Sequence, residues 1–183
     1  MKFIPQSIPD IFLIQPEIHG DSRGYFFETF RQDEFEQAIG RKIDFVQDSE
    51  SQSSKNTLRG LHFQLPPFAQ SKLVRVVKGR VLDVAVDIRK NSPSFGKHVS
   101  LELNESNKNQ LFLPVGFAHG FVVLSEIAIL SYKLGNYYSP EHEKGLAFDD
   151  KEVDIDWLLP RKQLILSKKD QNYPTLSQIK NHF

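Results

Sequence analysis

The sequence contains no cysteine, which excludes disulfide bonds and thiol chemistry. It carries no net charge, because 23 basic side chains balance 23 acidic ones, and this argues against bulk attraction to nucleic acid or anionic membrane. Long apolar runs are also missing, since "GFVVL" and "IAIL" are too short to cross a bilayer. The start, "MKFIPQSIPD", has prolines where a signal peptide needs an apolar core. We therefore expect a soluble, cytoplasmic protein.

The length of 183 residues suits one domain, which would bury roughly 70% of the surface that its unfolded chain exposes. The sequence shows no linker, no low-complexity segment and no repeat of fixed period. We therefore expect residues 1–183 to form a single domain.

Most of the sequence is typical of short strands separated by turn residues such as "KGR", "NSPSFGK" and "LNESNKN". Within 80–88, Asp83 and Asp87 share one face of an alternating pattern. One helix is predicted over 31–40, where Phe35 and Ile39 lie on one face and Gly40 ends the pattern. A further terminal helix is expected at 175–181. The predicted strands are 10–15, 24–30, 43–48, 58–63, 72–77, 80–88, 98–103, 109–114, 120–124 and 127–134. This pattern indicates an all-β sandwich or jelly-roll barrel with a few short peripheral helices.

Charged residues interrupt the apolar segment "LRGLHFQLPPFAQSKLVRVVKGRVLDVAVDIR". A charge inside a barrel costs several kcal/mol unless a ligand or another group compensates it. A lone histidine in a barrel wall is usually structural, but His62 has Arg59 and Gln64 nearby and Lys72 on the next predicted strand. A histidine that titrates near neutral pH among fixed cations is a candidate base. The other histidines, His19, His98, His142 and His182, lack such neighbours and are expected at the surface.

The spacing Pro-x-Gly-x-x-His in "LPVGFAHGF" resembles the second half of the cupin signature and would send His119 into the barrel. In metal-binding cupins the first half supplies two more histidines and a glutamate. Here the matching segment reads "LHFQ", so Gln64 stands where a second histidine is expected. His62 and His119 alone make an incomplete ligand set, and we expect no metal.

Two other segments have both a structural and a functional interpretation. "DSRGYFFETF" reads most simply as an edge strand with solvated charges, but Arg23 is also a candidate phosphate clamp and Phe26 a candidate aromatic wall. Tyr132 follows an apolar strand, where a tyrosine usually packs with its hydroxyl bonded, yet at a barrel mouth it can transfer a proton.

Seven segments between residues 3 and 175 together resemble the dTDP-4-dehydrorhamnose 3,5-epimerase family: "DSRGYFFE", "FVQD", "LRGLHFQ", "KLVRVVKGRVLDVAVDIRKNSPSFG", "LPVGFAHGF", "SYKLGNYYSPEHE" and "LSKKD". The resemblance implies a metal-free, cupin-like jelly roll that forms a homodimer and needs no cofactor. It also implies inversion of two carbons in a thymidine-diphosphate 4-keto-6-deoxy sugar, on the route to dTDP-L-rhamnose.

Position by position, the resemblance implies that His62 is the base and Asp170 its orienting partner. It makes Tyr132 the acid on the opposite sugar face and places Lys72 beside the ketone oxygen. Such a cation would stabilise the enolate that forms when a proton alpha to the ketone is removed. The implied substrate contacts are Arg23, Glu28, Gln47, Ser49, Arg59, His119, Glu143 and Lys169, and Phe26 is a further candidate contact from the interpretation of its own segment. Ser49 departs from the family, which usually has asparagine there, and a serine side chain does not reach as far.

Three alternatives remain at this point. One is a single-carbon epimerase that acts on another dTDP-4-keto-6-deoxy sugar, for which the proton-abstracting residues would be nearly the same. Another is a sugar-binding cupin without catalysis, for which the set of His62, Lys72, Tyr132 and Asp170 would be redundant. The third is a metal-dependent cupin oxygenase, for which "LHFQ" lacks ligands.

Overall fold

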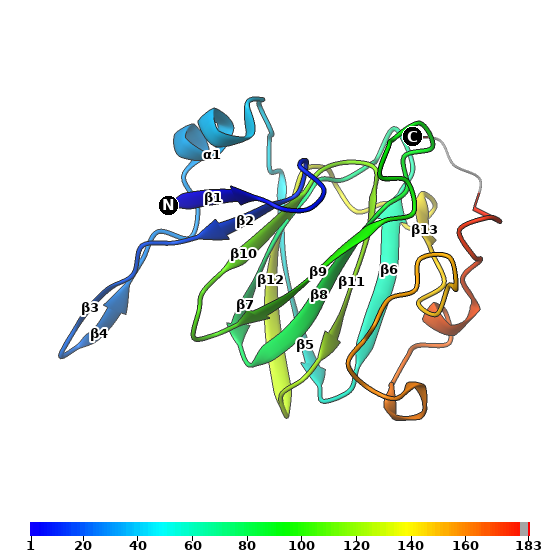
Figure 1. Ribbon diagram of the computed structural model, residues 1–183. Helices are drawn as coiled ribbons and strands as arrows, with labels where there is room; N and C mark the ends of the chain where they lie inside the picture. The colour runs from blue at the N-terminus through cyan, green and yellow to red at the C-terminus, as the bar shows by residue number, and fades with distance from the viewer. Residues whose placement is uncertain (180–182) are drawn as a thin grey trace.

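The computed structural model describes residues 1–179 and 183. Its main feature is a pair of antiparallel sheets packed face to face (Figure 1). The six-stranded sheet has the order β1 (Lys2–Pro5), β2 (Phe12–Gln15), β10 (Gln110–Leu113), β7 (Lys72–Lys78), β12 (Ile127–Leu134) and β5 (Gln47–Ser54). The five-stranded sheet has the order β13 (Glu143–Gly145), β6 (Leu58–Gln64), β11 (Phe117–Val123), β8 (Arg80–Asp87) and β9 (His98–Asn104). The fold is the expected all-β, cupin-like jelly roll.

The remaining elements lie outside the barrel. β3 (His19–Asp21) and β4 (Gly24–Phe26) form a two-stranded hairpin that projects away from the two sheets (Figure 1). The helix α1 spans Gln32–Ile39, and Gly40 ends it in the left-handed conformation, as the sequence predicts. Two short 3-10 helices, η1 (Arg161–Gln163) and η2 (Asp170–Asn172), lie in the carboxyl-terminal segment.

Three apolar clusters hold these parts together. The first fills the barrel between the sheets and includes Val74, Ala85 and Phe121. The second lies on the outer face of the five-stranded sheet, where the carboxyl-terminal segment, with Trp157 and Leu176, covers β6, β8 and β11. The third seats Phe35 of α1 on the outer face of the six-stranded sheet. Apolar side chains buried between β-sheets and against their covers supply the main driving force for this arrangement.

Several predicted boundaries were wrong. The segment 43–48 was expected to be a strand, but Ile43 and Phe45 pack against the third cluster and the strand β5 begins only at Gln47. The predicted strand 24–30 shrinks to the three residues of β4. The expected helix at 175–181 forms only a turn over its described part, and residues 180 and 181 lie outside the described residues. Within the described ranges, no helix is long and apolar enough to span a membrane.

Candidate active site

One end of the barrel holds a pocket of about 160 Å³ that both sheets line. His62 and Gln64 of β6 face it from the five-stranded sheet, and Lys72 of β7 and Tyr132 of β12 face it from the six-stranded sheet. The other lining residues are Ser49, Phe63, Gln70, Leu134, Tyr138 and Glu143. The two walls therefore bring together side chains that lie eight to seventy residues apart in the sequence.

His62 is paired with Asp170, which η2 presents from the carboxyl-terminal segment. The imidazole Nε2 lies 2.7 Å from Asp170 Oδ1, and the carboxylate is almost fully buried. A carboxylate only accepts hydrogen bonds, so Nε2 carries the proton and Nδ1 keeps the lone pair. The ring of Tyr173 packs edge-on against the imidazole, with 5.6 Å between the ring centroids. His62 is therefore held in one tautomer and one orientation, as a general base requires.

Lys72 reaches across from the other sheet and donates to the backbone oxygen of His62 at 3.4 Å. Burial lowers the pKa of this ammonium to about 8, against the opposing charges of Asp83 and Glu143. Near neutral pH the side chain is therefore mostly a cation, held in a site that hydrates it poorly. Such a cation is arranged to interact strongly with negative charge on a ligand.

Tyr132 lies on β12, and its Oη is 2.8 Å from Ser51 Oγ on the neighbouring strand β5. Burial raises the pKa of this phenol, and the hydrogen bond with Ser51 works in the opposite direction. The phenol therefore keeps its proton at neutral pH and is suited to act as an acid rather than as a base.

His119 and Asp83 form a second, deeper pair. His119 Nε2 lies 3.0 Å from both carboxylate oxygens of Asp83, and both side chains are buried. Burial lowers the pKa of His119, although the charge of Asp83 acts to raise it. Residue 119 stands directly opposite His62 in the pairing of β11 with β6. The imidazole of His119 lies edge-on to the ring of Tyr132, with 6.5 Å between the ring centroids.

Glycines allow the strands that carry the two histidines to lie unusually close. A Cβ at Gly60 would lie 2.5 Å from the Cα of Gly120, and the φ of Gly60 is +134°. A Cβ at Gly120 would in turn lie 2.8 Å from the backbone oxygen of Arg59. The close contact of β6 with β11 thus depends on both positions lacking a side chain.

The rim of the pocket is polar. Glu143 accepts a hydrogen bond from the Tyr138 hydroxyl at 2.8 Å and pairs closely with Lys169. Burial acts to raise the pKa of Glu143, but the hydrogen bonds from Lys169 and Tyr138 outweigh it and lower the pKa. Arg59 is exposed, and its Nε donates to Ser53 Oγ at 2.9 Å. Gln47 Nε2 donates to Ser49 Oγ at 3.0 Å.

Most of the residues predicted for the site therefore meet at this end of the barrel. Arg23, Phe26 and Glu28 do not. Arg23 and Phe26 lie in or beside the β3–β4 hairpin, Phe26 is 68% exposed, and Arg23 is paired with Asp21. Glu28 follows the hairpin and is exposed as well. Among the other histidines, His19 is exposed, His98 and His142 are half-buried, and His182 lies outside the described residues.

Sequence reasoning missed several residues of this region, among them Ser51, Asp83 and Tyr138. The pairing of Asp83 with Asp87 on one face of an otherwise apolar strand was the available signal for a polar interior position. Ser51 gave no signal, because its strand has no apolar alternation. Tyr138 lines the pocket and is 54% exposed.

The described residues do not form a metal site. No three side chains of His, Cys, Asp or Glu in that part of the chain gather in a way that could hold a metal ion. Gln64, at the position where a cupin would place a ligand, is fully engaged elsewhere. Its amide nitrogen donates to the backbone oxygens of Phe68 and Tyr137, and its oxygen accepts from the backbone of Ser139.

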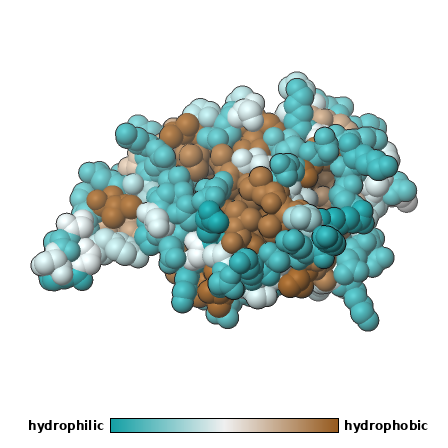
Figure 2. Space-filling view, turned by 60° about the horizontal axis from the view of Figure 1, so that its bottom comes forward, coloured by the Kyte–Doolittle hydropathy of each residue, from teal (hydrophilic) through white to brown (hydrophobic). Residues whose placement is uncertain are grey.

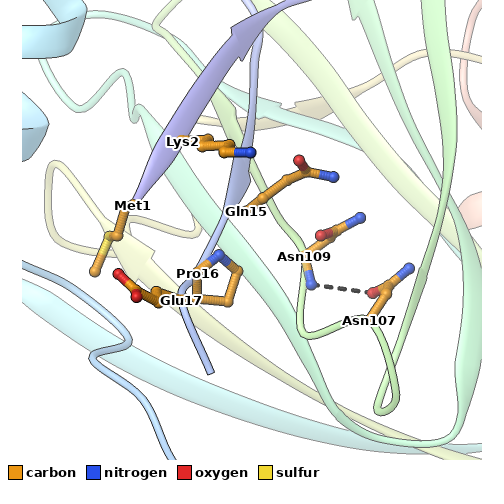
Figure 3. A pocket seen from close by; sticks show the side chains of 7 residues that line it. All are labelled: Met1, Lys2, Gln15, Pro16, Glu17, Asn107 and Asn109. Atoms are coloured by element: carbon orange, nitrogen blue, oxygen red, sulfur yellow. Dashed lines mark hydrogen bonds between the residues drawn. The ribbon is translucent and has the colours of Figure 1, made fainter. Parts of the chain in front are cut away.

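A larger hollow of about 660 Å³ lies away from this constellation, beside the edge strand β1 (Figure 3). Its polar side chains are Lys2, Gln15, Glu17, Asn107 and Asn109. They include no histidine or tyrosine that could exchange a proton with a carbon atom. Size alone therefore does not mark the reactive site, and the titratable groups do.

Comparison with known proteins agrees with this geometry. The family model described as dTDP-4-dehydrorhamnose 3,5-epimerase matches residues 5–178. The chain belongs to this family. The dTDP-4-dehydrorhamnose 3,5-epimerase of Shigella flexneri is 53% identical over 172 residues, which cover 94% of each chain.

Solved structures of the family superimpose closely on this one. The dTDP-4-dehydrorhamnose 3,5-epimerase from Elizabethkingia anophelis is 48% identical and covers 97% of each chain, with a TM-score of 0.93. The dTDP-6-deoxy-D-glucose-3,5-epimerase from Legionella pneumophila, solved in complex with dTDP-4-keto-L-rhamnose, is 45% identical with a TM-score of 0.94. That match covers 97% of this chain and 94% of the other.

Proposed function

We propose that this protein inverts carbons 3 and 5 of dTDP-4-dehydro-6-deoxy-D-glucose and so forms dTDP-4-dehydro-L-rhamnose. The observation that carries the proposal is the meeting of three groups in one pocket: the His62–Asp170 pair, the half-buried cation of Lys72, and the phenol of Tyr132. These are the groups that a proton transfer at a carbon beside a ketone requires.

In the first half of the reaction, Nδ1 of His62 takes a proton from the carbon next to the ketone. The electron pair of that C–H bond forms the C=C bond of an enolate, and negative charge moves to the ketone oxygen. Lys72 stabilises this charge, an effect of about 3 kcal/mol for one well-placed donor in a water-poor site. Asp170 stabilises the imidazolium that results.

In the second half, a proton returns to the same carbon from the other face of the sugar. His62 comes from the five-stranded sheet and Tyr132 from the six-stranded sheet, so the two groups approach from opposite walls of the pocket. Tyr132 supplies the proton, and the configuration at the carbon is inverted. The placement of His62 and Tyr132 on opposite walls supports inversion of the carbon's configuration rather than proton exchange with retention.

The rest of the substrate lies outside this pocket. The volume of the pocket, about 160 Å³, is below the roughly 300–1,000 Å³ of sites that enclose a whole ligand of this size. We assign the sugar to the pocket and the diphosphate to the exposed rim, where Arg59 offers a guanidinium for phosphate oxygens. Gln47, Ser49, His119, Glu143 and Lys169 complete the proposed contacts.

We further propose that the protein works as a homodimer in which the β3–β4 hairpin of each chain contributes substrate contacts to the active site of the partner subunit. The hairpin projects from its own barrel (Figure 1) and carries the exposed Phe26 together with Arg23, which the family resemblance places at the substrate. Hydrophobic side chains also gather near the middle of the face shown in Figure 2. An exposed aromatic and a cation on a projecting arm are typical of a contact with another chain.

The remaining proposals concern the setting of the enzyme. We propose one domain over residues 1–183 and a cytoplasmic location, which the lack of cysteine suits.

We also predict that the reaction needs no metal, because Gln64 replaces a ligand and its amide is bonded to the backbone. Turnover should survive exhaustive chelation, with elemental analysis to check removal. Activity that disappears on chelation and returns with zinc, iron or manganese would contradict this prediction.

The decisive experiment is incubation with dTDP-4-keto-6-deoxyglucose in deuterated water, followed by NMR. The proposal expects deuterium at both carbons that flank the ketone, together with the inverted product. Deuterium at one carbon would instead indicate a single-carbon epimerase. Binding without any deuterium would indicate a sugar-binding module that performs no chemistry.

A further inference from the structure

The strand β5 turns a row of polar side chains inward, and one of them, Ser49, lines the pocket. Along Gln47–Ser54 the burial alternates, with every second residue turned inward and the others exposed. The inward residues are Gln47, Ser49, Ser51 and Ser53, and the outward residues are Asp48, Glu50, Gln52 and Ser54. The alternation is that of an ordinary strand, but its inner face is polar rather than apolar, and Ser49 on that face lines the pocket.

Each inward serine is within hydrogen-bond distance of another polar side chain of this region. Ser49 accepts from Gln47, and Ser53 accepts from the guanidinium of Arg59. Ser51 lies 2.8 Å from the phenol oxygen of Tyr132. Tyr132 stands opposite Ser49 in the pairing of β12 with β5, so Ser51 is its diagonal neighbour and meets it only at the end of the long tyrosine side chain.

We propose that Ser51 is a positioning residue for the second half of the reaction, because it fixes the phenol of Tyr132 and directs the phenolic proton at the sugar. The proposal rests on the function proposed above. A phenol that must donate its proton to a carbon atom cannot also donate that proton in a hydrogen bond to a neighbouring side chain. Ser51 must therefore be the donor in the Ser51–Tyr132 bond, with Tyr132 Oη as the acceptor.

The proton transfer then balances as follows. The C=C electron pair of the enolate takes the phenolic proton and becomes the new C–H bond, and the ketone is restored. The O–H bond of Tyr132 breaks and leaves a phenolate, which still accepts the hydrogen bond from Ser51. Before the next turnover a proton from solvent water restores the phenol, and the imidazolium of His62 releases to water the proton that it took from the carbon.

The surroundings explain why such a bond matters. Burial disfavours the phenolate, and the buried charge of Asp83 acts in the same direction. The hydrogen bond of Ser51 and the positive charge of Arg59 both favour the phenolate. A hydrogen bond to a charged group is worth about twice one between neutral groups, so the bond strengthens as the proton leaves.

The test separates removal of the proton from its return. We would compare Ser51→Thr with Ser51→Val, since these side chains have nearly the same shape and differ in the hydroxyl. Both are β-branched residues that favour strands, so the fold should tolerate them equally. Ser54→Ala, on the outward face of the same strand, is the control for a change in β5 itself. Thermal unfolding checks that each variant is folded.

Deuterium wash-in and formation of inverted product would be measured for each variant in deuterated water. In Ser51→Val we expect inversion to fall by about 10- to 100-fold, with wash-in at retained configuration and KM close to wild type. Ser51→Thr should recover most of the inversion, and Ser54→Ala should behave as wild type.

Two results would overturn the assignment. One is Ser51→Val inverting as fast as Ser51→Thr, which would show that the hydroxyl is not needed. The other is an equal loss of wash-in and inversion in Ser51→Val, which would make Ser51 a general structural residue. Failure of the proposed function itself is distinguishable, because the wild-type protein would then show neither wash-in nor inversion.

Discussion

Tyr132 and His62 reach the pocket from different sheets, so removal of the phenol hydroxyl should leave proton abstraction by His62 intact. In Tyr132→Phe the ring keeps its packing and a single hydroxyl is lost. His62 and Lys72 still form the enolate, which is then reprotonated from the side that lost the proton. We expect deuterium in the substrate with retained configuration and little inverted product, as measured by NMR.

The companion variant for that experiment is His62→Asn, which should abolish wash-in and inversion together. Inversion by Tyr132→Phe at nearly the wild-type rate would reduce Tyr132 to a wall residue. Loss of wash-in from Tyr132→Phe would mean that the tyrosine is needed for binding or for enolate formation.

Lys72 shows the opposition between stability and function at a single residue. Its folded-state pKa of about 8 lies below the value of about 10.4 expected in the unfolded chain. Below pH 8 the side chain is charged in both states, and the full cost of burying the charge weakens the folded state. As pH rises from 8 to 10.4, only the unfolded chain still binds the proton, so this cost is relieved.

We therefore expect Lys72→Met to be inactive but more stable than wild type at pH 7, by about 2–3 kcal/mol in the free energy of unfolding. The advantage should shrink toward pH 10. Urea unfolding at several pH values measures it, and Lys78→Met, at an exposed position of the same strand, is the control. A variant that is no more stable than wild type at pH 7 would refute the prediction.

At the scale of the elements, the contact between β6 and β11 has a matched pair of test positions. Gly60 and Gly24 have almost the same φ, +134° and +136°. An added Cβ meets Gly120 at residue 60, whereas nothing lies within 4 Å at residue 24. The difference in stability between the two alanine variants therefore measures the cost of disturbing the close contact between β6 and β11.

We expect Gly60→Ala to lose about 3 kcal/mol or more of stability and Gly24→Ala about 1 kcal/mol, from the strained backbone alone. Gly60→Ala should also lose activity, because the shift moves His62 on β6. Denaturant unfolding and turnover assays measure both effects. Equal destabilisation by the two changes would show that the contact with Gly120 is easily relieved.

The elements also show what sequence patterns can and cannot predict. α1 and β8 were predicted because their apolar residues keep a helical or an alternating period against a core. β5 was misplaced because apolar Ile43 and Phe45 precede it, while its own residues are polar on both faces. A strand without a buried apolar face leaves no hydrophobic period to read.

The site residues likewise fall into those that the sequence pattern indicated and those that it did not. His62 and Lys72 stood out as charges within apolar strands. The role of Asp170 came only from the family resemblance, since it lies 108 residues from His62 and in a polar segment. Ser51 meets Tyr132 across 81 residues, a contact that no local pattern encodes.

At the scale of the whole molecule, a mixing experiment tests the proposed exchange of hairpins. One chain would carry His62→Asn and the other Arg23→Ala with Phe26→Ala. If each hairpin serves the partner, a mixed dimer has one intact site and one doubly defective site. Statistical mixing should then restore about a quarter of wild-type activity from two inactive parents.

If each hairpin served its own barrel, every site in the mixed dimer would contain a defect and activity would stay absent. Light scattering of the wild-type protein provides the control, with a mass of twice the 21.1 kDa chain expected. A mass near that of a single chain at micromolar concentration would contradict the dimer.

The cover on the outer face of the five-stranded sheet has a spectroscopic consequence. Trp157 is the single tryptophan of the sequence, it is buried in that cover, and its Nε1 donates to the backbone oxygen of Phe148 at 2.8 Å. The same segment presents Asp170 to His62, and contacts between residues so distant in the chain form late in folding. The fluorescence of this one indole therefore follows the refolding step in which the catalytic histidine acquires its partner, and enzymatic activity should return with the same time constant.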